Sequence, residues 1–250
     1  MKFNKRIVIV GATSSIAHHC ARLWVNGVSI ELILVGRNIE RLDRVALDLK
    51  VRSPNSEIRV VLCDFVDTEA IQVTVNRIFK KGDVDIVLIA HGSLPEQSDC
   101  ETSLQICREN LEINGLSPVL FAEAFAMHMS KANHGTLALI GSVAGDKGRK
   151  SNYVYGSSKG MVERYCQGLQ HRFFKTDVKI ILIKPGPTLT PMTAHINNIY
   201  SKMASVESVA HKIVDAISAG KSVAYIPFKW RIIMMIIRHL PNFIFNRLGI

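Results

Sequence analysis

The chain has 250 residues, of which 48% are hydrophobic, and a chain of this length can bury one sizeable core as a single α/β domain. Its formal net charge is +10, but no zinc-finger or mixed aromatic and basic pattern accompanies that charge, so we expect no nucleic-acid partner. The five cysteines include no C-x-x-C pair, which argues against a disulfide framework or a metal site and indicates reduced thiols in the cytoplasm. No apolar stretch reaches the ~18 residues that a membrane-spanning helix needs.

The first predicted elements are a strand and a helix joined by a tight turn. Residues Ile7–Val10 form a short apolar run, and the amphipathic pattern of a helix covers Ile16–Val25. A strand that leads into a helix in this way points backbone N–H groups and the positive end of the helix at a phosphate. We interpret the connecting turn as a dinucleotide cradle, with an ordinary βα turn as the alternative. The residues expected to hold the phosphates are Gly11, Thr13, Ser14, Ser15 and Ile16.

The end of the second predicted strand bears on the choice of cofactor. This strand, Ile30–Val35, is followed by Gly36 and Arg37. Proteins that bind NAD place a carboxylate near this point for the ribose hydroxyls, whereas an arginine suits the 2′-phosphate of NADP. Gly36 stands where the carboxylate would be, so Arg37 predicts NADP(H), and a solvated loop charge is the alternative. Asn38 is expected to cap the next helix, which runs to about Lys50.

Strands and helices continue to alternate along the rest of the chain. We expect strands at Val60–Leu62, Val84–Ile89, Thr136–Ile140, Lys179–Ile183 and Ser222–Ile226, and helices ending near Lys81, from Cys100 to about Lys131, from about Ser151, and at Ser205–Ala219. Unbroken apolar strands are typical of a parallel sheet covered on both faces. The pattern predicts a Rossmann-type, doubly wound parallel sheet of the α/β class.

A tyrosine and a lysine four residues apart follow the fifth of these strands. Tyr155 and Lys159 would lie on one face of a helix. A nearby ammonium favours the phenolate, so the pair would make a general acid or base. Ser142, at the end of strand Thr136–Ile140, would hold a substrate oxygen beside the phenol, and this chemistry suits a carbonyl and its alcohol. The alternative is a solvated lysine beside a half-buried tyrosine.

With the N-terminal turn and this helix in the same chain, the sequence resembles the short-chain dehydrogenase/reductase family over almost its whole length. The family's serine, its Tyr-x-x-x-Lys motif and its upstream asparagine are matched by Ser142, Tyr155, Lys159 and Asn114. Its Thr-Gly-x-x-x-Gly-x-Gly turn is only partly present, since the four marked positions hold Val10, Gly11, Ser15 and Ala17. After the fourth strand, where the family usually has Asn-Asn-Ala-Gly, His91 stands in place of the alanine.

The resemblance implies roles for further residues. Asp64 would hold the adenine with its side chain, and Phe65 with its backbone N–H. Asn114 would order a water that links the lysine to solvent, although an asparagine in a helix can simply bond a helical carbonyl. Residues expected beside the cofactor are Ala90, Gly92, Lys159, Pro185, Gly186, Thr188 and Thr190, the last near the nicotinamide carboxamide. The family also implies a homo-oligomer, and the scattered cysteines predict no metal.

Beyond Pro227 the chain changes character, and we divide it into a Rossmann domain, 1–227, and a tail, 228–250. From Lys221 onward there are five basic residues and no acidic one. A helix over 228–240 would be ~20 Å long, too short for a bilayer core of ~30 Å. Arg231 and Arg238 would share one polar stripe on an otherwise apolar helix, which predicts a helix lying in a membrane interface. Packing against the core, against a partner subunit or over the substrate as a lid is the alternative.

Together these features predict an NADPH-dependent reductase of a ketone, with Tyr155 as proton donor. The tail is similar to that of bacterial reductases such as the ketoreductase subunit of decaprenylphosphoryl-ribose 2′-epimerisation. That likeness implies a hydrophobic or lipid-linked keto-sugar, met at the inner face of the membrane. A non-catalytic cofactor-binding or scaffolding subunit at the membrane surface is the alternative, because the glycine turn departs from the family pattern.

Overall fold

The computed structural model describes residues 3–193 and 203–248. Seven strands form one parallel sheet in the order β3-β2-β1-β4-β5-β6-β7, which confirms the doubly wound Rossmann arrangement. The order reverses between β1 and β4, and open sheets of this kind bind ligands beyond the carboxyl ends of the strands near that point. The strands are β1 (Arg6–Val10), β2 (Glu31–Gly36), β3 (Glu57–Leu62), β4 (Ile86–Ile89), β5 (Thr136–Ile140), β6 (Lys179–Pro185) and β7 (Val223–Ile226).

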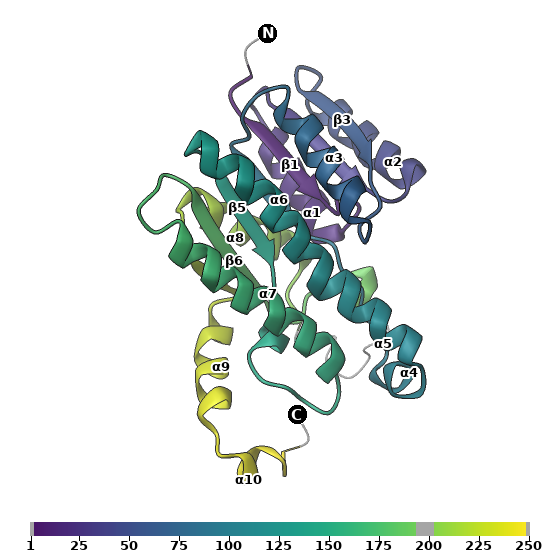
Figure 1. Ribbon diagram of the computed structural model, residues 1–250, viewed down its shortest axis with the longest axis vertical. Helices are drawn as coiled ribbons and strands as arrows, with labels where there is room; N and C mark the ends of the chain where they lie inside the picture. Colours follow the sequence, from purple (N-terminus) through teal and green to yellow (C-terminus); the bar gives the residue numbers. More distant parts are fainter. Residues whose placement is uncertain (1–2, 194–202, 249–250) are drawn as a thin grey trace.

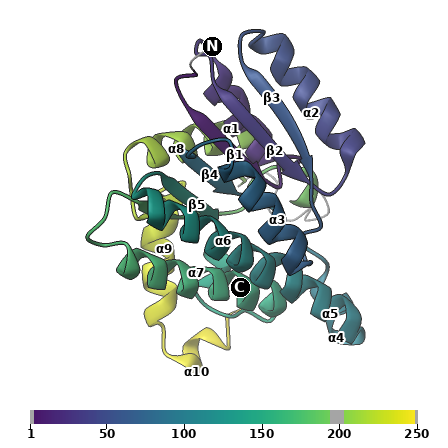
Figure 2. The ribbon, with the colours of Figure 1, turned by 45° about the horizontal axis from the view of Figure 1, so that its top comes forward.

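Helices cover both faces of the sheet (Figures 1 and 2). One face packs against α1 (Ser15–Val25), α2 (Ile39–Arg52) and α8 (Val206–Ser218), and the other against α3 (Thr68–Phe79), α6 (Ser117–Ala132) and α7 (Tyr153–Arg172). Successive strand residues point to opposite faces, so Ile7 and Ile9 enter the first core while Val8 and Val10 enter the second. All four are completely buried, which explains the continuous apolar run in the sequence.

The long helix predicted from Cys100 to Lys131 is interrupted in the structure, and the prediction of one continuous element is wrong. The segment consists of α4 (Gln97–Thr102), α5 (Leu104–Leu111), the π-helical turn η1 (Glu112–Leu116) and α6. Ser103 separates the first two helices and caps α5, since its Oγ accepts a hydrogen bond from the N–H of Ile106 at 3.3 Å. The π turn then shifts the helical phase just where Asn114 lies.

The last helices among the described residues are α9 (Lys229–His239) and α10 (Asn242–Phe245), drawn in yellow in Figure 1 at the edge of the layered body. The predicted amphipathic tail helix is therefore present, while residues 249 and 250 of the tail lie outside the described residues. Within the described ranges, we find no helix that combines the length and the apolar character needed to cross a membrane. Two short 3₁₀ turns, η2 (Val143–Gly145) and η3 (Pro191–Thr193), follow β5 and β6.

Candidate active site

Three of the predicted catalytic residues come together where β5 ends and α7 begins. Ser142 lies just beyond β5, and its Oγ accepts a hydrogen bond from the N–H of Ala144 at 3.1 Å. Tyr155 and Lys159 lie about one turn apart on α7, and Nζ of Lys159 is 5.8 Å from the centroid of the Tyr155 ring. The side chain of Ser142 hydrogen-bonds the phenol of Tyr155. A hydroxyl, a phenol and an ammonium thus meet at the carboxyl end of the sheet.

Asn114, the fourth predicted catalytic residue, lies in η1 and is completely buried. Its Oδ1 accepts a hydrogen bond from the N–H of Ser93 at 2.9 Å, and its Nδ2 donates to the carbonyl of Asn110 at 3.1 Å. A β-carbon at Gly92 would lie 2.6 Å from Oδ1 of Asn114 and 3.7 Å from Nζ of Lys159, so glycine leaves room for both side chains. The bond to a helical carbonyl exists, but the same amide also fixes the backbone after β4 next to Lys159.

The predicted dinucleotide cradle has the geometry of a tight glycine turn. Gly11 has φ of +82°, and a β-carbon there would lie 2.6 Å from the backbone nitrogen of His91, so only glycine fits. The N–H of Ser14 donates to the carbonyl of Gly11 at 2.9 Å and closes the turn. The residues that follow, Thr13 to Ile16, are partly or fully exposed, and the N–H groups in the first turn of a helix have no intrahelical acceptor. They are therefore available to an anion.

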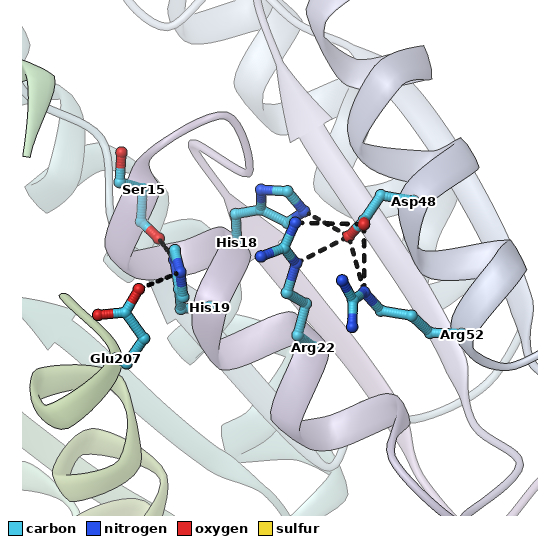
Figure 3. Close-up of polar contacts among 7 residues, drawn as sticks. All are labelled: Ser15, His18, His19, Arg22, Asp48, Arg52 and Glu207. Carbon is cyan, nitrogen blue, oxygen red and sulfur yellow. Dashed lines mark hydrogen bonds and ion pairs between the residues drawn. The ribbon is translucent and has the colours of Figure 1, made fainter.

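Polar contacts hold the cradle helix α1 against its neighbours on both sides (Figure 3). On the α8 side, Nδ1 of His19 hydrogen-bonds the carbonyl of Ser15 at 2.8 Å, and its Nε2 lies 3.2 Å from a carboxylate oxygen of Glu207. On the α2 side, the carboxylate of Asp48 accepts hydrogen bonds from three side chains, those of His18, Arg22 and Arg52. These contacts fix the start of α1 relative to the helices beside it.

The residues predicted for the adenosine end lie together beyond β2 and β3. Arg37 is exposed, and its guanidinium carbon lies 5.6 Å from the centroid of the Phe65 ring. Phe65 itself is buried, with its ring centroid 4.5 Å from that of His91, so only its backbone remains for a ligand. Asp64 is exposed, and its Oδ1 accepts a hydrogen bond from the N–H of Val66 at 3.0 Å.

The first two residues after β4, Ala90 and His91, are buried. Ala90 and His91 are each 7% exposed, and Nε2 of His91 lies 2.9 Å from Oγ of Ser117. Burial holds the pKa of His91 well below its usual value, and the nearby charges of Lys159 and Arg37 lower that pKa further. His91 is therefore a neutral, hydrogen-bonded residue under the site rather than an exposed titrating group.

The Pro-Gly loop continues directly from β6. Pro185 is the last residue of that strand, and Thr188 is buried with its Oγ1 donating a hydrogen bond to the carbonyl of Gly186 at 2.9 Å. The N–H of Thr190 donates to Oγ1 of Thr193 at 3.2 Å. These bonds order the loop, which follows the carboxyl end of β6 as Ser142 follows that of the neighbouring strand β5.

Comparison with known proteins shows the family of the chain. The family described as short chain dehydrogenase matches residues 5–200. The chain belongs to the short-chain dehydrogenase family. Among curated relatives, it is 27% identical to an uncharacterized oxidoreductase of Streptomyces coelicolor, over 98% of this chain and 96% of the relative. It is also 27% identical to an uncharacterized oxidoreductase of Mycobacterium tuberculosis, over 97% of this chain and 96% of the relative.

Solved short-chain dehydrogenases share the fold. A short-chain dehydrogenase from Sphingobium yanoikuyae, solved in complex with NADPH, superposes with a TM-score of 0.81 at 19% identity, covering 95% of this chain and 97% of the other. A bulky-bulky ketone specific alcohol dehydrogenase from Comamonas testosteroni superposes with a TM-score of 0.80 at 18% identity, covering 99% and 96%.

As a short-chain dehydrogenase, the protein is an NAD(P)-dependent oxidoreductase that acts on a small molecule. The residues present suit a nicotinamide dinucleotide, because the cradle offers backbone N–H donors, and Arg37 and Lys159 add cationic donors for its phosphate and ribose groups. The altered cradle of this short-chain dehydrogenase still packs closely. Ala17, at the position of the last family glycine, is completely buried in the core on the α1 side.

Burial disfavours the charged form of both titrating groups of the site, so it moves their two pKa values in opposite directions. It raises the pKa of Tyr155 to about 12, although the hydrogen bond from Ser142 opposes the rise. Burial also lowers the pKa of Lys159 to about 8. The expectation that the ammonium would bring the phenol pKa below its ordinary value is therefore wrong for this structure, because desolvation of the phenol dominates.

Sequence reasoning missed two features next to the site. The indole of Trp230 lies against Gly186, so that a β-carbon on this glycine would collide with it. Lys184, one residue before Pro185, is 1% exposed and forms ion pairs with Asp146 and Glu163. The only sequence signal for the second feature is a charge directly after the apolar run of β6, which was interpreted as the end of the strand.

Proposed function

We propose that this short-chain dehydrogenase reduces a ketone to a secondary alcohol with NADPH. The observation that carries the proposal is the convergence of Ser142, Tyr155 and Lys159 beyond β5. A protonated phenol beside a hydroxyl can hold and protonate an oxygen that becomes negative during the reaction. Because the pKa of Tyr155 is about 12, the phenol carries its proton near neutral pH and is ready to act as an acid. In this protonation state the phenol can supply the proton that reduction of a ketone requires.

Each side chain then has a distinct task. A bound nicotinamide dinucleotide supplies the hydride for the reduction. Tyr155 donates its phenolic proton to the carbonyl oxygen, which the hydroxyl of Ser142 orients. The ammonium of Lys159 stabilises the phenolate that remains and holds the nicotinamide ribose. Asn114 supports the return of a proton from solvent, since it is hydrogen-bonded to the backbone beside Gly92 and Lys159.

The preference for NADP(H) over NAD(H) rests on the end of β2. Gly36 offers no carboxylate to the ribose hydroxyls, and Arg37 follows with an exposed guanidinium positioned over the Phe65 ring. A guanidinium already held near an aromatic ring loses less side-chain entropy when it binds a phosphate. Asp64 and the N–H of Phe65 are proposed to hold the adenine, and the loop from Pro185 to Thr190 the nicotinamide.

We further propose that the ketone is hydrophobic or lipid-linked, for example a lipid-linked keto-sugar, and is met at the inner face of a membrane. The support comes from the tail, because α9 lies against the Pro-Gly loop through Trp230 and carries exposed apolar side chains. A homo-oligomer, common among short-chain dehydrogenases, is proposed with it. The division into a Rossmann domain, 1–227, and a tail, 228–250, remains part of this proposal.

The activity is tested by following NADPH absorbance on addition of hydrophobic ketones to wild-type protein and to Tyr155→Phe. Loss of the acid should lower kcat by about 10²–10⁴-fold. Tyr153→Phe is the matched control, because Tyr153 lies two residues earlier on α7 and is 43% exposed. Equal turnover by the Tyr155→Phe and Tyr153→Phe proteins would contradict the assignment. NADPH binding without turnover of any ketone would favour a non-catalytic, cofactor-binding subunit instead.

Cofactor choice is tested by titrating nicotinamide fluorescence with NADPH and NADH. Arg37→Ala should weaken NADPH binding at least tenfold and leave NADH binding nearly unchanged, since a charged hydrogen bond to the phosphate is lost. Lys50→Ala removes an exposed positive charge at the far end of α2 and serves as the control. If Arg37→Ala weakened the binding of NADPH and NADH equally, the arginine would not be binding the 2′-phosphate.

A further inference from the structure

The tail is fixed to the two loops that border the candidate active site. Trp230 of α9 lies against Gly186 of the Pro-Gly loop, and Met234 of the same helix is 2% exposed. Farther along, Nζ of Lys147 donates a hydrogen bond to the carbonyl of Leu240 at 2.9 Å and lies 4.5 Å from the ring centroid of Phe245. The helix is therefore seated on the protein by one side and both of its ends are held.

The opposite side of α9 is open to solvent and apolar, except for His239 at the C-terminal end of the helix, seven residues after Ile232. Its apolar side chains are those of Phe228, Ile232, Met235 and Ile236, which are 61%, 52%, 57% and 56% exposed, and their spacing places them on one helical face. We call these four residues the tail face. A solvated helix normally carries polar side chains on its outer side, and a continuous exposed apolar patch marks a contact surface.

Basic side chains border the tail face. Arg231 and Arg238, seven residues apart, follow one edge, and the guanidinium of Arg231 lies 5.8 Å from the Phe228 ring centroid. Lys229 lies on the other edge, seven residues before Ile236 and so on nearly the same line of the helix. The sequence from Lys221 to the end contains no acidic residue that could neutralise them.

We propose that the tail face docks onto an anionic phospholipid surface. An apolar strip between two basic borders fits the boundary between acyl chains and negatively charged headgroups. A second copy docking through the same face would bring these basic borders together with no acidic tail residue between them, which opposes pairing of two tails. This surface deepens the proposed function, because it would place the loops after β5 and β6 near a lipid-linked ketone, but its test needs no turnover.

The test is co-sedimentation of the full chain with vesicles of phosphatidylcholine alone and of phosphatidylcholine mixed with phosphatidylglycerol. Wild-type protein should bind the mixed vesicles, bind the neutral ones much more weakly, and dissociate as salt is raised. Ile232→Glu combined with Ile236→Glu should abolish binding. Arg231→Gln combined with Arg238→Gln should weaken it on the order of tenfold. No binding by the wild type, or equal binding to both vesicles, would overturn the proposal.

Matched variants separate docking from general effects. Val51→Glu and Leu104→Glu add the same charge at apolar positions that are 82% and 87% exposed and lie outside the tail, and they should bind vesicles almost as the wild type does. If Ile232→Glu with Ile236→Glu instead converted a dimer to a monomer in the absence of lipid, the occupant would be a second copy and the proposal would be wrong. All variants are also assayed with a water-soluble ketone. A tail-face variant that no longer binds vesicles but still turns over the water-soluble ketone would show that docking and the proposed reaction can be lost separately.

Discussion

Lys159 and Lys184 are both buried, with 3% and 1% of their surfaces exposed, yet their surroundings are opposite. Nζ of Lys184 lies 2.7 Å from a carboxylate oxygen of Glu163 and also contacts Asp146. Burial alone would lower its pKa, but the hydrogen bonds and charges of the two carboxylates raise that pKa above its usual value. Nζ of Lys159 donates a hydrogen bond to the carbonyl of Ile140 at 3.2 Å. No carboxylate is paired with Lys159 among residues 3–193 and 203–248, and burial lowers its pKa to about 8.

The comparison indicates that Lys184 has a structural role, whereas Lys159 is available to a ligand. A buried ammonium with two carboxylates is neutralised by the protein itself and locks three elements together. A buried ammonium without a carboxylate destabilises the fold, and perturbed groups of this kind cluster at functional sites. The two lysines therefore predict opposite effects of the same substitution.

The largest expected effect belongs to Lys184→Met. Removing the ammonium leaves the carboxylate of Asp146, whose side chain is completely buried, and that of Glu163 without a cation. Breaking a buried pair in this way costs about 3–5 kcal/mol. The free energy of unfolding, measured by urea denaturation, should fall by that order, whereas Lys179→Met, at the exposed start of the same strand, should change little.

A combined variant sharpens this result. Lys184→Met together with Asp146→Asn and Glu163→Gln removes the uncompensated charges, and replacement of a whole buried ion cluster is often nearly neutral. The combined protein should recover most of the lost stability. If Lys184→Met alone unfolded at the same urea concentration as the wild type, the three groups would not form a paired, buried cluster.

The second largest effect on the free energy of unfolding is expected for Lys159→Met, and it has the opposite sign to that of Lys184→Met. Lys159→Met should stabilise the protein at neutral pH, by up to about 3 kcal/mol for a shift from 10.5 to about 8 at 1.36 kcal/mol per pKa unit. The unfolded chain binds more protons than the folded one between about pH 8 and 10.5, so the wild type gains stability as the pH rises through this range. The advantage of the variant should therefore shrink towards about pH 10.

Thermal unfolding of the wild type and Lys159→Met across this pH range measures the difference. The comparison between the two proteins matters, because the raised pKa of Tyr155 adds a separate loss of stability above about pH 10 in both. If the stability difference between the two proteins were the same at all pH values, the charged form of Lys159 would not destabilise the folded protein. Ketone reduction should be lost in the variant, which would pair higher stability with lower activity.

The contrast also indicates what sequence can and cannot give. Tyr155, Lys159 and Ser142 were found because their geometry is local: a four-residue helical spacing, and a strand end that the apolar pattern marks. Most of the sheet was predicted for the same reason, since most strands contain an unbroken apolar run between turn residues. In β3 the run is interrupted by Arg59, and only its end, Val60–Leu62, was predicted. The fold class and the outline of the site therefore follow from short-range patterns.

Contacts between distant residues were not predictable. Lys184 lies 21 residues from Glu163, and Tyr225 donates a hydrogen bond to Asp146 across 79 residues, so no spacing rule connects them. The π turn around Asn114 leaves the apolar pattern of a helix almost intact and so went unseen. The direction of the Tyr155 pKa depends on burial, which sequence alone does not measure.

The smallest expected effect is at Asp48 on α2, a partly exposed carboxylate that also pairs with several side chains. Partial burial raises its pKa, but hydrogen bonds from Arg22, His18 and Arg52 (Figure 3) outweigh burial and hold that pKa well below its usual value. Its side chain is 27% exposed, so solvent screens the pairs and Asp48→Asn should cost only ~1 kcal/mol at neutral pH.

Acid should erase that cost. A depressed carboxyl pKa stabilises the fold above the unfolded value of about 4 and loses this contribution as the pH falls below it. Urea denaturation of the wild type and Asp48→Asn should therefore converge below about pH 4, while Asp43→Asn, on the exposed side of the same helix, should match the wild type throughout. If the difference in stability between the wild type and Asp48→Asn widened in acid, the amide would be weakening the packing between α1 and α2 rather than an ion pair. The partly exposed cluster around Asp48 would then differ in kind from the buried cluster around Lys184, and not only in magnitude.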